Sequence, residues 1–211
     1  MAFSRRSLLA TAGTGLLLGA TGSFAQAQSA GTTPATDSRF APRVLGNPNA
    51  KLVVEEWFSL TCIHCAHFAE NTFPQVKKNL IDTGKIRYVF HDFPTDQLAI
   101  LASMVARTLP VDRYEAFALS LLSSLDRWAY VRESSPVEAL KKMAAFAGMP
   151  GDTFDKTIAD QQLMQFILNQ QTDAQNKYHF DSTPTFRFND KVQVSNDMSY
   201  DEFVKHLSEA S

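Results

Sequence analysis

The chain of 211 residues contains two cysteines, Cys62 and Cys65, and they follow directly on a strand pattern. The segment 51–58, KLVVEEWF, is apolar and rich in β-branched and aromatic residues, which predicts a buried strand. Apolar residues then recur at a helical period from Cys62 to about position 81, and the segment 85–90, KIRYVF, predicts a second strand. This spacing predicts a β-α-β unit with two parallel strands and a right-handed crossover.

The remainder of the chain separates into a helical block and a C-terminal pair of strands. Between positions 95 and 177 the sequence carries helical patterns and hardly any strand signal. Segments 184–189 and 192–195 alternate like the two arms of an antiparallel hairpin. The series Ser199-Tyr200-Asp201-Glu202 is a capping box that opens a last helix. The element order therefore predicts an α/β fold: β-α-β, then a helical block, then β-β-α.

The first 27 residues are typical of a signal peptide rather than of a folded domain. Arg5-Arg6 precedes a weakly apolar run, and Ala25-Gln26-Ala27 matches a small-x-small cleavage site. The paired arginines favour twin-arginine export, which would bring the protein to the periplasm. The polar segment 28–43 predicts a flexible leader. The net charge is −2, so the composition indicates no nucleic-acid partner.

Four roles are open to the Cys-x-x-Cys pair, and three of them fit this sequence poorly. A disulfide at this spacing closes a very small loop, so it would stabilise little as a structural staple. A structural zinc site needs four ligands, and no second pair with zinc-finger spacing accompanies Cys62 and Cys65. Haem attachment needs histidine directly after the second cysteine, where this chain has Ala66. We therefore expect no metal and no cofactor, and we favour a redox-active pair.

A redox role has a physical basis at this position in the chain. Cys62 lies just before the predicted helix, with Ser59 or Thr61 available to cap it, and a helix N-terminus stabilises a thiolate. We expect Cys62 to be the exposed nucleophile with a low pKa, and Cys65, one turn further on, to be the resolving thiol. His64 can supply a further hydrogen-bond donor or a positive charge to the Cys62 thiolate, which would make the disulfide more oxidising.

The motifs VVEEWFSLTCIHCAHF, GKIRYVFHDFP and DSTPTFRFND together resemble the DsbA-like thiol-disulfide oxidoreductases, a thioredoxin-fold group with an inserted helical domain. The resemblance spans about residues 44–207. It implies a thioredoxin-like domain formed by residues 44–95 and 178–211, with a helical insertion at 96–177. Ile63 stands where DsbA-like proteins frequently have proline, which leaves the oxidising power of the pair open.

The same resemblance implies roles for particular residues. Cys62 corresponds to the nucleophile and Cys65 to its resolving partner, joined as a disulfide in the oxidised form. Thr183-Pro184 corresponds to the loop whose proline is cis, which would face the cysteines and bind substrate backbone. Glu56 corresponds to the buried acid under the active site, where burial raises the pKa of a carboxyl and lets it exchange a proton with Cys65. The neighbouring Glu55 leaves this last assignment open.

These observations predict a periplasmic dithiol oxidase that acts on reduced or misoxidised exported proteins. A membrane redox partner would restore its disulfide, an expectation that follows from the resemblance alone. A disulfide isomerase or reductase of the same fold is the main alternative, but the leader is short and lacks a heptad pattern, so we expect a monomer. A non-enzymatic metal-binding or chaperone-like envelope protein is a further alternative, and the lack of additional Cys, Met or His clusters argues against it.

Overall fold

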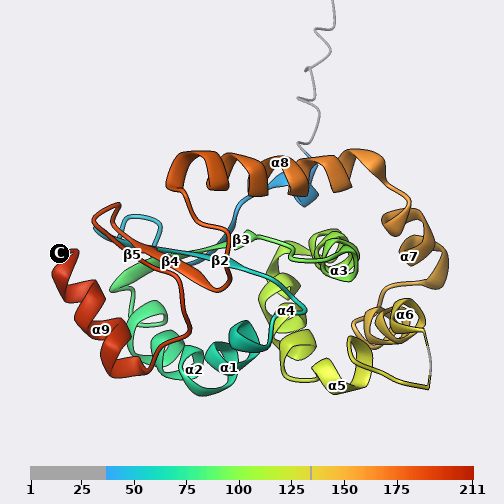
Figure 1. Cartoon of the computed structure of the whole chain (residues 1–211), viewed down its shortest axis with the longest axis horizontal. Coiled ribbons are helices and arrows are strands. Elements are labelled where there is room, and N and C mark those ends of the chain that lie inside the picture. The colour runs from blue at the N-terminus through green and yellow to red at the C-terminus, as the bar shows by residue number, and fades with distance from the viewer. Residues whose placement is uncertain (1–36, 134) are drawn as a thin grey trace, which may run out of the picture. The chain divides into compact units, whose positions relative to one another are not determined.

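The computed structural model describes residues 37–133 and 135–211. Within these ranges a five-stranded mixed sheet has the order β1-β3-β2-β4-β5 (Figure 1). The strands are β1 (Arg43–Gly46), β2 (Leu52–Phe58), β3 (Ile86–Asp92), β4 (Thr185–Phe188) and β5 (Val192–Val194). The helices are α1 (Ile63–Asn71), α2 (Phe73–Val76), α3 (Gln97–Thr108), α4 (Tyr114–Leu122), α5 (Leu125–Trp128), α6 (Pro136–Phe146), α7 (Gly151–Ile158), α8 (Gln161–Tyr178) and α9 (Tyr200–Glu209), with shorter helical turns η1 (Ser38–Phe40), η2 (Lys77–Ile81) and η3 (Val111–Arg113). In this described part of the chain, no helix is both long enough and apolar enough to span a bilayer.

The predicted β-α-β unit is present at the centre of the sheet. β2 pairs in parallel with β3, with Glu56 opposite Phe90 in the register, and α1, α2 and η2 form the crossover between them. β4 pairs antiparallel with both β2 and β5, which confirms the predicted hairpin. Trp57 lies opposite Thr185 in this pairing. The chain that leaves β2 towards the cysteines therefore passes the chain that enters β4.

Side chains alternate across the sheet, and different helices cover its two faces. Val54 and Phe58 point to the face of the main hydrophobic core. Figure 1 shows α1, α2 and α9 on one side of the sheet and α8 running across the other side. Trp57 points to the side of α8, where it packs with Phe93, Ala174 and Phe180. The residues of β2 that alternate with Trp57 therefore point toward α1 and its cysteines.

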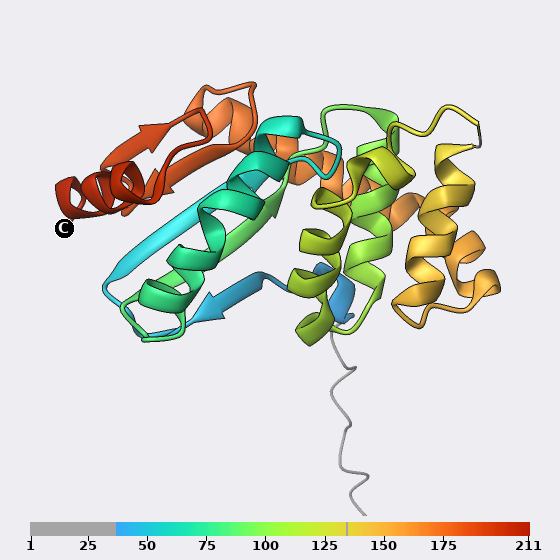
Figure 2. The ribbon, with the colours of Figure 1, turned by 90° about the horizontal axis from the view of Figure 1, so that it is seen from below.

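The predicted helical block is present as α3 to α8. Figure 2 shows α3 to α7 beside the sheet, on the side away from β5 and α9. A buried ion pair joins the block to the sheet: Arg107 of α3 donates through Nε to Asp92 at the end of β3, and the Tyr114 hydroxyl donates to the same carboxylate at 2.9 Å. The described residues form one compact unit, so the boundaries between the two expected domains stay a prediction.

The start of the described chain differs from the flexible leader that the sequence predicts over residues 28–43. Residues 37–43 form η1 and the beginning of β1, and β1 pairs antiparallel with β3. Arg43 is buried, and its Nη1 donates to the carbonyls of Ser38 at 3.1 Å and Ala41 at 2.8 Å. Phe40 of the same segment packs against Phe166 of α8, with 4.9 Å between ring centroids. The pairing with β3 and this ring contact are made with distant residues, so the polar composition of the segment did not indicate them. The predicted signal peptide and the rest of the leader lie outside the described residues.

Candidate active site

The two cysteines lie at the start of α1, directly after β2 and a short turn. Cys62 is the N-cap residue, with extended backbone (φ −80°, ψ 123°) and a half-buried side chain. Cys65 lies one turn into the helix and is fully buried. Both are free cysteines in the structure, which therefore corresponds to the reduced pair. The disulfide between them stays a prediction.

The N-terminus of α1 has no side-chain cap, so the expected capping by Ser59 or Thr61 is wrong. Ser59 Oγ lies 3.2 Å from Thr61 Oγ1 and 2.9 Å from Thr95 Oγ1. Thr61 Oγ1 in turn donates to the carboxylate of Asp96, the N-cap residue of α3. These hydroxyls are engaged with one another and with α3. The N–H groups in the first turn of α1 are therefore left to interact with the Cys62 sulfur.

The pKa of the Cys62 thiol falls to about 5, from an ordinary value of 9.0. The hydrogen bond from the Cys65 thiol is the largest cause, and the Thr183 side chain and the backbone N–H groups of Cys65 and His64 act in the same direction. Partial burial opposes them. Cys62 Sγ also lies 3.3 Å from the Thr183 carbonyl oxygen, a contact in which only the protonated thiol can donate. The donors prevail, so Cys62 is a thiolate at neutral pH.

Cys65 has the opposite character, with a pKa well above the ordinary value of a thiol. Burial is the main cause, followed by the hydrogen bond to Cys62, the negative charge of Cys62 and the charge of Glu56. The reduced pair thus holds one thiolate, at Cys62, while Cys65 keeps its proton. This asymmetry is what a nucleophile and a resolving thiol require, and those two roles stay predictions.

Glu56 is the buried acid beneath the cysteines, and the structure resolves the choice between Glu55 and Glu56. Glu56 is 3% exposed, and burial raises the pKa of its carboxyl to about 7. The Tyr88 hydroxyl, which donates to Oε2 at 2.7 Å, partly offsets this rise, and the negative charge of Cys62 adds to it. Glu55 points to the opposite face of the sheet, where its Oε1 lies 3.1 Å from Nε2 of His91.

A small cavity adjoins the Glu56 side chain. Its volume is about 10 Å³, and apart from Glu56 it is lined by apolar residues of β2, β3, α1, α2 and α4. A single water needs about 10–15 Å³, so the cavity lies at the lower limit for one molecule. Proton exchange between Glu56 and Cys65 stays a prediction.

The peptide bond between Thr183 and Pro184 is cis, as predicted. This bond directly precedes β4, and the Thr183 carbonyl lies 3.3 Å from Cys62 Sγ although 121 residues separate the two in sequence. The loop therefore faces the cysteines. Its predicted role in binding substrate backbone is untested by this geometry.

The structure provides a hydrogen-bond donor from His64 to the Cys62 sulfur, its backbone N–H, whereas a positive charge from His64 at the thiolate stays a prediction. Nδ1 of His64 lies 3.3 Å from Oδ1 of Asp197, and the side chain is 62% exposed. Asp197 also accepts a hydrogen bond from the nearby His67, whose Nδ1 lies 2.6 Å from Oδ2. The effect of His64 on the Cys62 sulfur that the structure supports is therefore that of its backbone N–H.

Sequence reasoning missed three residues that contact the active-site segment. Asp197 comes from the loop before α9, Tyr88 from β3, and Tyr130 from the chain that follows α5. The Tyr130 hydroxyl donates to the carbonyl of Thr61, directly before Cys62. Alternation along β3 could have assigned Tyr88 to the Glu56 face, but no local pattern marks Asp197 or Tyr130.

The described residues contain no group of three or more His, Cys, Asp and Glu side chains that could hold a metal ion. One surface hollow is lined by α4, α5 and α6, and another lies beside the active-site helix, lined by His67, Asp197 and further residues of α1, α2 and the loop before α9; neither includes a cysteine. The chemistry that the site itself offers is thiol chemistry, with a stabilised thiolate, a protonated partner thiol and a buried acid.

Comparison with known proteins agrees with the fold. A family model described as thioredoxin matches residues 39–209. The crystal structure of Wolbachia pipientis alpha-DsbA1 superposes with a TM-score of 0.74 at 30% sequence identity, covering 80% of this chain and 90% of that one. The chain belongs to the thioredoxin family. Within that family it is a DsbA-like protein, with the inserted helical domain of that group.

Curated relatives carry names of the same class. A Rickettsia felis protein with the name "Putative protein-disulfide oxidoreductase" is 30% identical over 154 residues, which cover 72% of this chain and 54% of the relative. "Disulfide bond formation protein D" of Bacillus subtilis is 26% identical over 179 residues, which cover 78% of this chain and 74% of that protein. The chain thus spans little more than half the length of the rickettsial relatives that it matches.

Proposed function

We propose that the protein is an exported dithiol oxidase that transfers its Cys62–Cys65 disulfide to dithiols of other exported proteins. The contrast between the two thiols supports this most: the pKa of Cys62 is about 5, and that of Cys65 lies well above its ordinary value. A stabilised thiolate favours the reduced pair, and a disulfide whose reduced form is stabilised is a strong oxidant. The names of the relatives belong to the same class of activity.

The proposed reaction has two exchange steps that balance in electrons and protons. A substrate thiolate attacks Cys62 of the enzyme disulfide, forming a mixed disulfide and releasing Cys65 as a thiolate that takes up a proton. The second substrate thiolate then attacks the substrate sulfur of the mixed disulfide and releases Cys62 as a thiolate. Its low pKa makes Cys62 a good leaving group in this step. The substrate is oxidised by two electrons, and the enzyme pair is reduced by two.

Surrounding residues would assist both steps. Glu56, with a pKa of about 7, is protonated in an appreciable fraction of molecules at neutral pH and can supply the proton that Cys65 takes up. Backbone of the Thr183-Pro184 loop beside Cys62 would pair with the substrate chain and hold its sulfur in line. We propose the periplasm as the compartment, a monomer as the active form, and a membrane redox partner for reoxidation.

Two variants and one potential test the proposal. Cys62→Ser should abolish oxidation of a dithiol peptide. Cys65→Ala, incubated with the disulfide form of the same peptide, should accumulate a mixed disulfide at Cys62 that electrophoresis without reductant resolves, because no second enzyme thiol can release it. Full oxidase activity of Cys62→Ser would exclude the mechanism. The reduction potential of the pair should lie nearer that of DsbA, about −120 mV, than that of thioredoxin, about −270 mV.

The same preparation distinguishes the alternatives. A dimer or trimer in analytical ultracentrifugation, with a potential near that of thioredoxin, would favour an isomerase or reductase. A stoichiometric metal in the purified reduced protein would favour a metal-binding role. A monomer with a strongly oxidising pair supports the oxidase.

A further inference from the structure

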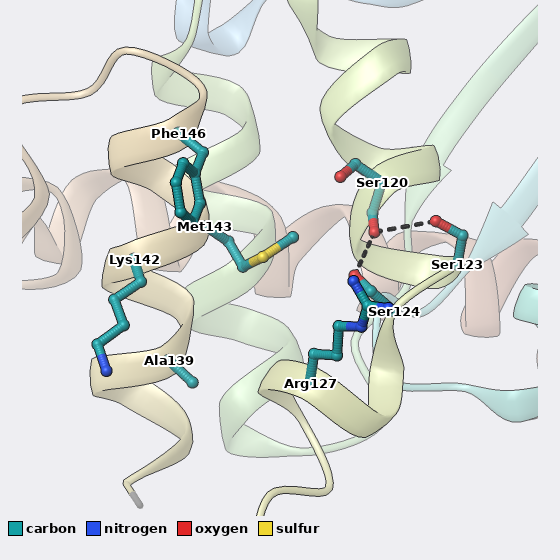
Figure 3. Close-up of a pocket in the computed structure, with 8 residues that line it drawn as sticks. All are labelled: Ser120, Ser123, Ser124, Arg127, Ala139, Lys142, Met143 and Phe146. Carbon is teal, nitrogen blue, oxygen red and sulfur yellow. Dashed lines mark hydrogen bonds between the residues drawn. The ribbon is translucent and has the colours of Figure 1, made fainter.

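A groove on the helical insertion lies between α4 and α5 on one side and α6 on the other (Figure 3). It consists of a hollow of about 550 Å³ that adjoins a second hollow of about 330 Å³, and the two share Ser120, Met143 and Phe146 in their walls. We call this feature the α4–α6 groove. It is separate from the cysteine site, because neither hollow includes a residue of β2, α1 or the loop before β4.

One wall of the α4–α6 groove presents apolar side chains to solvent. Phe146, the last residue of α6, is 89% exposed, and Met143 lies one turn before it on the same face (Figure 3). An aromatic side chain with this exposure buries almost none of its surface in the fold. The wall is therefore suited to cover part of an apolar side chain of a partner.

The charges that line the groove are all positive. Arg127 of α5 and Lys142 of α6 line the larger hollow, Arg113 of η3 lines the smaller one, and no carboxylate lines either. Among the described residues, neither Arg127 nor Lys142 has an acidic partner within ion-pair distance, whereas Lys141 beside it is paired with Asp155. The chain as a whole carries a net charge of −2, so this cationic concentration is local.

The opposite wall supplies polar groups and leads to the active site. Ser123 and Ser124 both donate to the carbonyl of Ser120, which turns their hydroxyls along the wall (Figure 3). Three residues after Arg127, the Tyr130 hydroxyl donates to the carbonyl of Thr61, directly before Cys62. Three residues of chain span at most about 11 Å. One end of the groove is thus close along the chain to the contact between the insertion and the active-site loop.

We propose that the α4–α6 groove binds an acidic, cysteine-free segment of the substrate polypeptide, with carboxylates at Arg127 and Lys142 and an apolar side chain on Met143 and Phe146. The identity of the occupant as substrate rests on the proposed oxidase function; the binding itself does not. A polypeptide is favoured over a lipid surface because the groove combines three cations with a row of serines and one exposed aromatic ring. Such a segment would raise the local concentration of its cysteines at Cys62.

The first test measures binding without any thiol chemistry. The probe is a fluorescent synthetic peptide of alternating Glu and Leu or Phe residues, and its comparator has Lys in place of Glu. The full chain should bind the acidic peptide and not the basic one, and affinity should fall as salt rises. Arg127→Glu and Lys142→Glu should each weaken binding about threefold, and the double variant about tenfold. Phe146→Ala should weaken it without changing its salt dependence.

The matched control is Lys205→Glu, the same change of charge at an exposed lysine of α9. It should leave the affinity of the acidic peptide unchanged. Equal binding by wild type and the double variant, or equal binding of the basic peptide, would overturn the proposal. Anionic vesicles that sediment with wild type but not with Lys142→Glu, while the peptide does not bind, would assign the groove to a membrane instead. Self-association lost in the same variant would assign it to a second copy, and would equally overturn the proposal.

The second test links the groove to turnover and separates it from the proposed function. Two dithiol peptides are compared, one carrying the acidic extension and one without it. In wild type the ratio of their kcat/KM values should exceed unity, and in the double variant it should fall to about unity. No oxidation of either peptide by wild type would refute the oxidase function and leave the measured binding intact. Oxidation of both with a ratio of unity in wild type would refute the substrate role of the groove alone.

Discussion

The hydroxyl of Tyr88 donates a hydrogen bond of 2.7 Å to Oε2 of Glu56, and both side chains are buried on the face of the sheet that carries α1. The hydrogen bond stabilises the carboxylate, but burial outweighs it, so the pKa of Glu56 still rises to about 7. The two residues lie on neighbouring strands. Tyr88 of β3 is paired with Val54, and Glu56 lies two residues further along β2 on the same face. A buried acid with a pKa near neutral pH thus lies beneath a pair of thiols whose own pKa values are far apart.

The raised pKa of Glu56 predicts a pH-dependent loss of stability. The folded protein binds the proton more tightly than the unfolded chain, so this stabilisation is fully present below pH 4.5 and is lost as pH rises through about 7. The total loss amounts to about 3 kcal/mol, at 1.36 kcal/mol for each pKa unit. Urea unfolding of Cys62→Ser, in which Cys62 cannot titrate, should reveal this decline, and Glu56→Gln in that background should abolish it.

Glu55→Gln is the matched control for that measurement, because Glu55 is the adjacent acid on the opposite face of β2 and is 23% exposed beside His91. It should leave the decline between pH 4.5 and 7 in place. A decline that disappears in Glu55→Gln and persists in Glu56→Gln would contradict the assignment of the buried acid.

The Cys62 thiol predicts a pH dependence of opposite sign in the reduced protein. Its pKa is lowered in the folded state, so the stabilisation is fully present above pH 9.0 and is lost as pH falls through about 5. Ultraviolet absorbance of the thiolate should titrate with a midpoint near 5, and reduced Cys62→Ser should lack both the absorbance change and the stability change. A midpoint close to that of a free thiol would refute the donor arrangement at the start of α1.

His64→Ala should leave the low pKa of Cys62 largely intact. The imidazole is directed to Asp197, and the donor that His64 offers to the sulfur is its backbone N–H, which alanine retains. We expect a shift of less than about half a pKa unit in the thiolate titration, because no hydrogen bond to the sulfur is removed. Cys65→Ala is the comparison, since it removes the largest cause and should raise the midpoint clearly. A rise in His64→Ala as large as in Cys65→Ala would mean that the ring does act on the thiolate.

The buried Arg107–Asp92 pair predicts a large stability effect at the junction of the helices and the sheet. Arg107→Met would leave the Asp92 carboxylate buried with the Tyr114 hydroxyl as its remaining donor, and should cost about 3–5 kcal/mol in chemical denaturation. Adding Asp92→Leu should recover part of that loss, because the uncompensated charge is removed. Lys141→Met, which breaks the exposed pair with Asp155, should have a far smaller effect. If Arg107→Met were as stable as wild type, the proposed importance of the junction would be contradicted.

Local sequence patterns predicted the elements that carry the cysteines. The apolar run of β2, the helical period after Cys62 and the capping box at Ser199 and Glu202 all act within a few residues, and each is present in the structure. Local patterns did not decide whether Glu55 or Glu56 is the buried acid. Apolar neighbours lie on both faces of β2, with Trp57 on one and Phe58 on the other, so alternation alone could not tell which face carries the active site.

The sequence by itself determined the β-α-β unit, the position of Cys62 at a strand-to-helix turn and the cis peptide before Pro184, because these features follow from local periodicity and from a motif of known form. Only the tertiary structure decided which groups act on the sulfur. The Thr183 carbonyl reaches Cys62 across 121 residues of sequence, and Asp197 lies 3.3 Å from the His64 ring. Such contacts depend on how distant segments pack, which a local pattern does not encode.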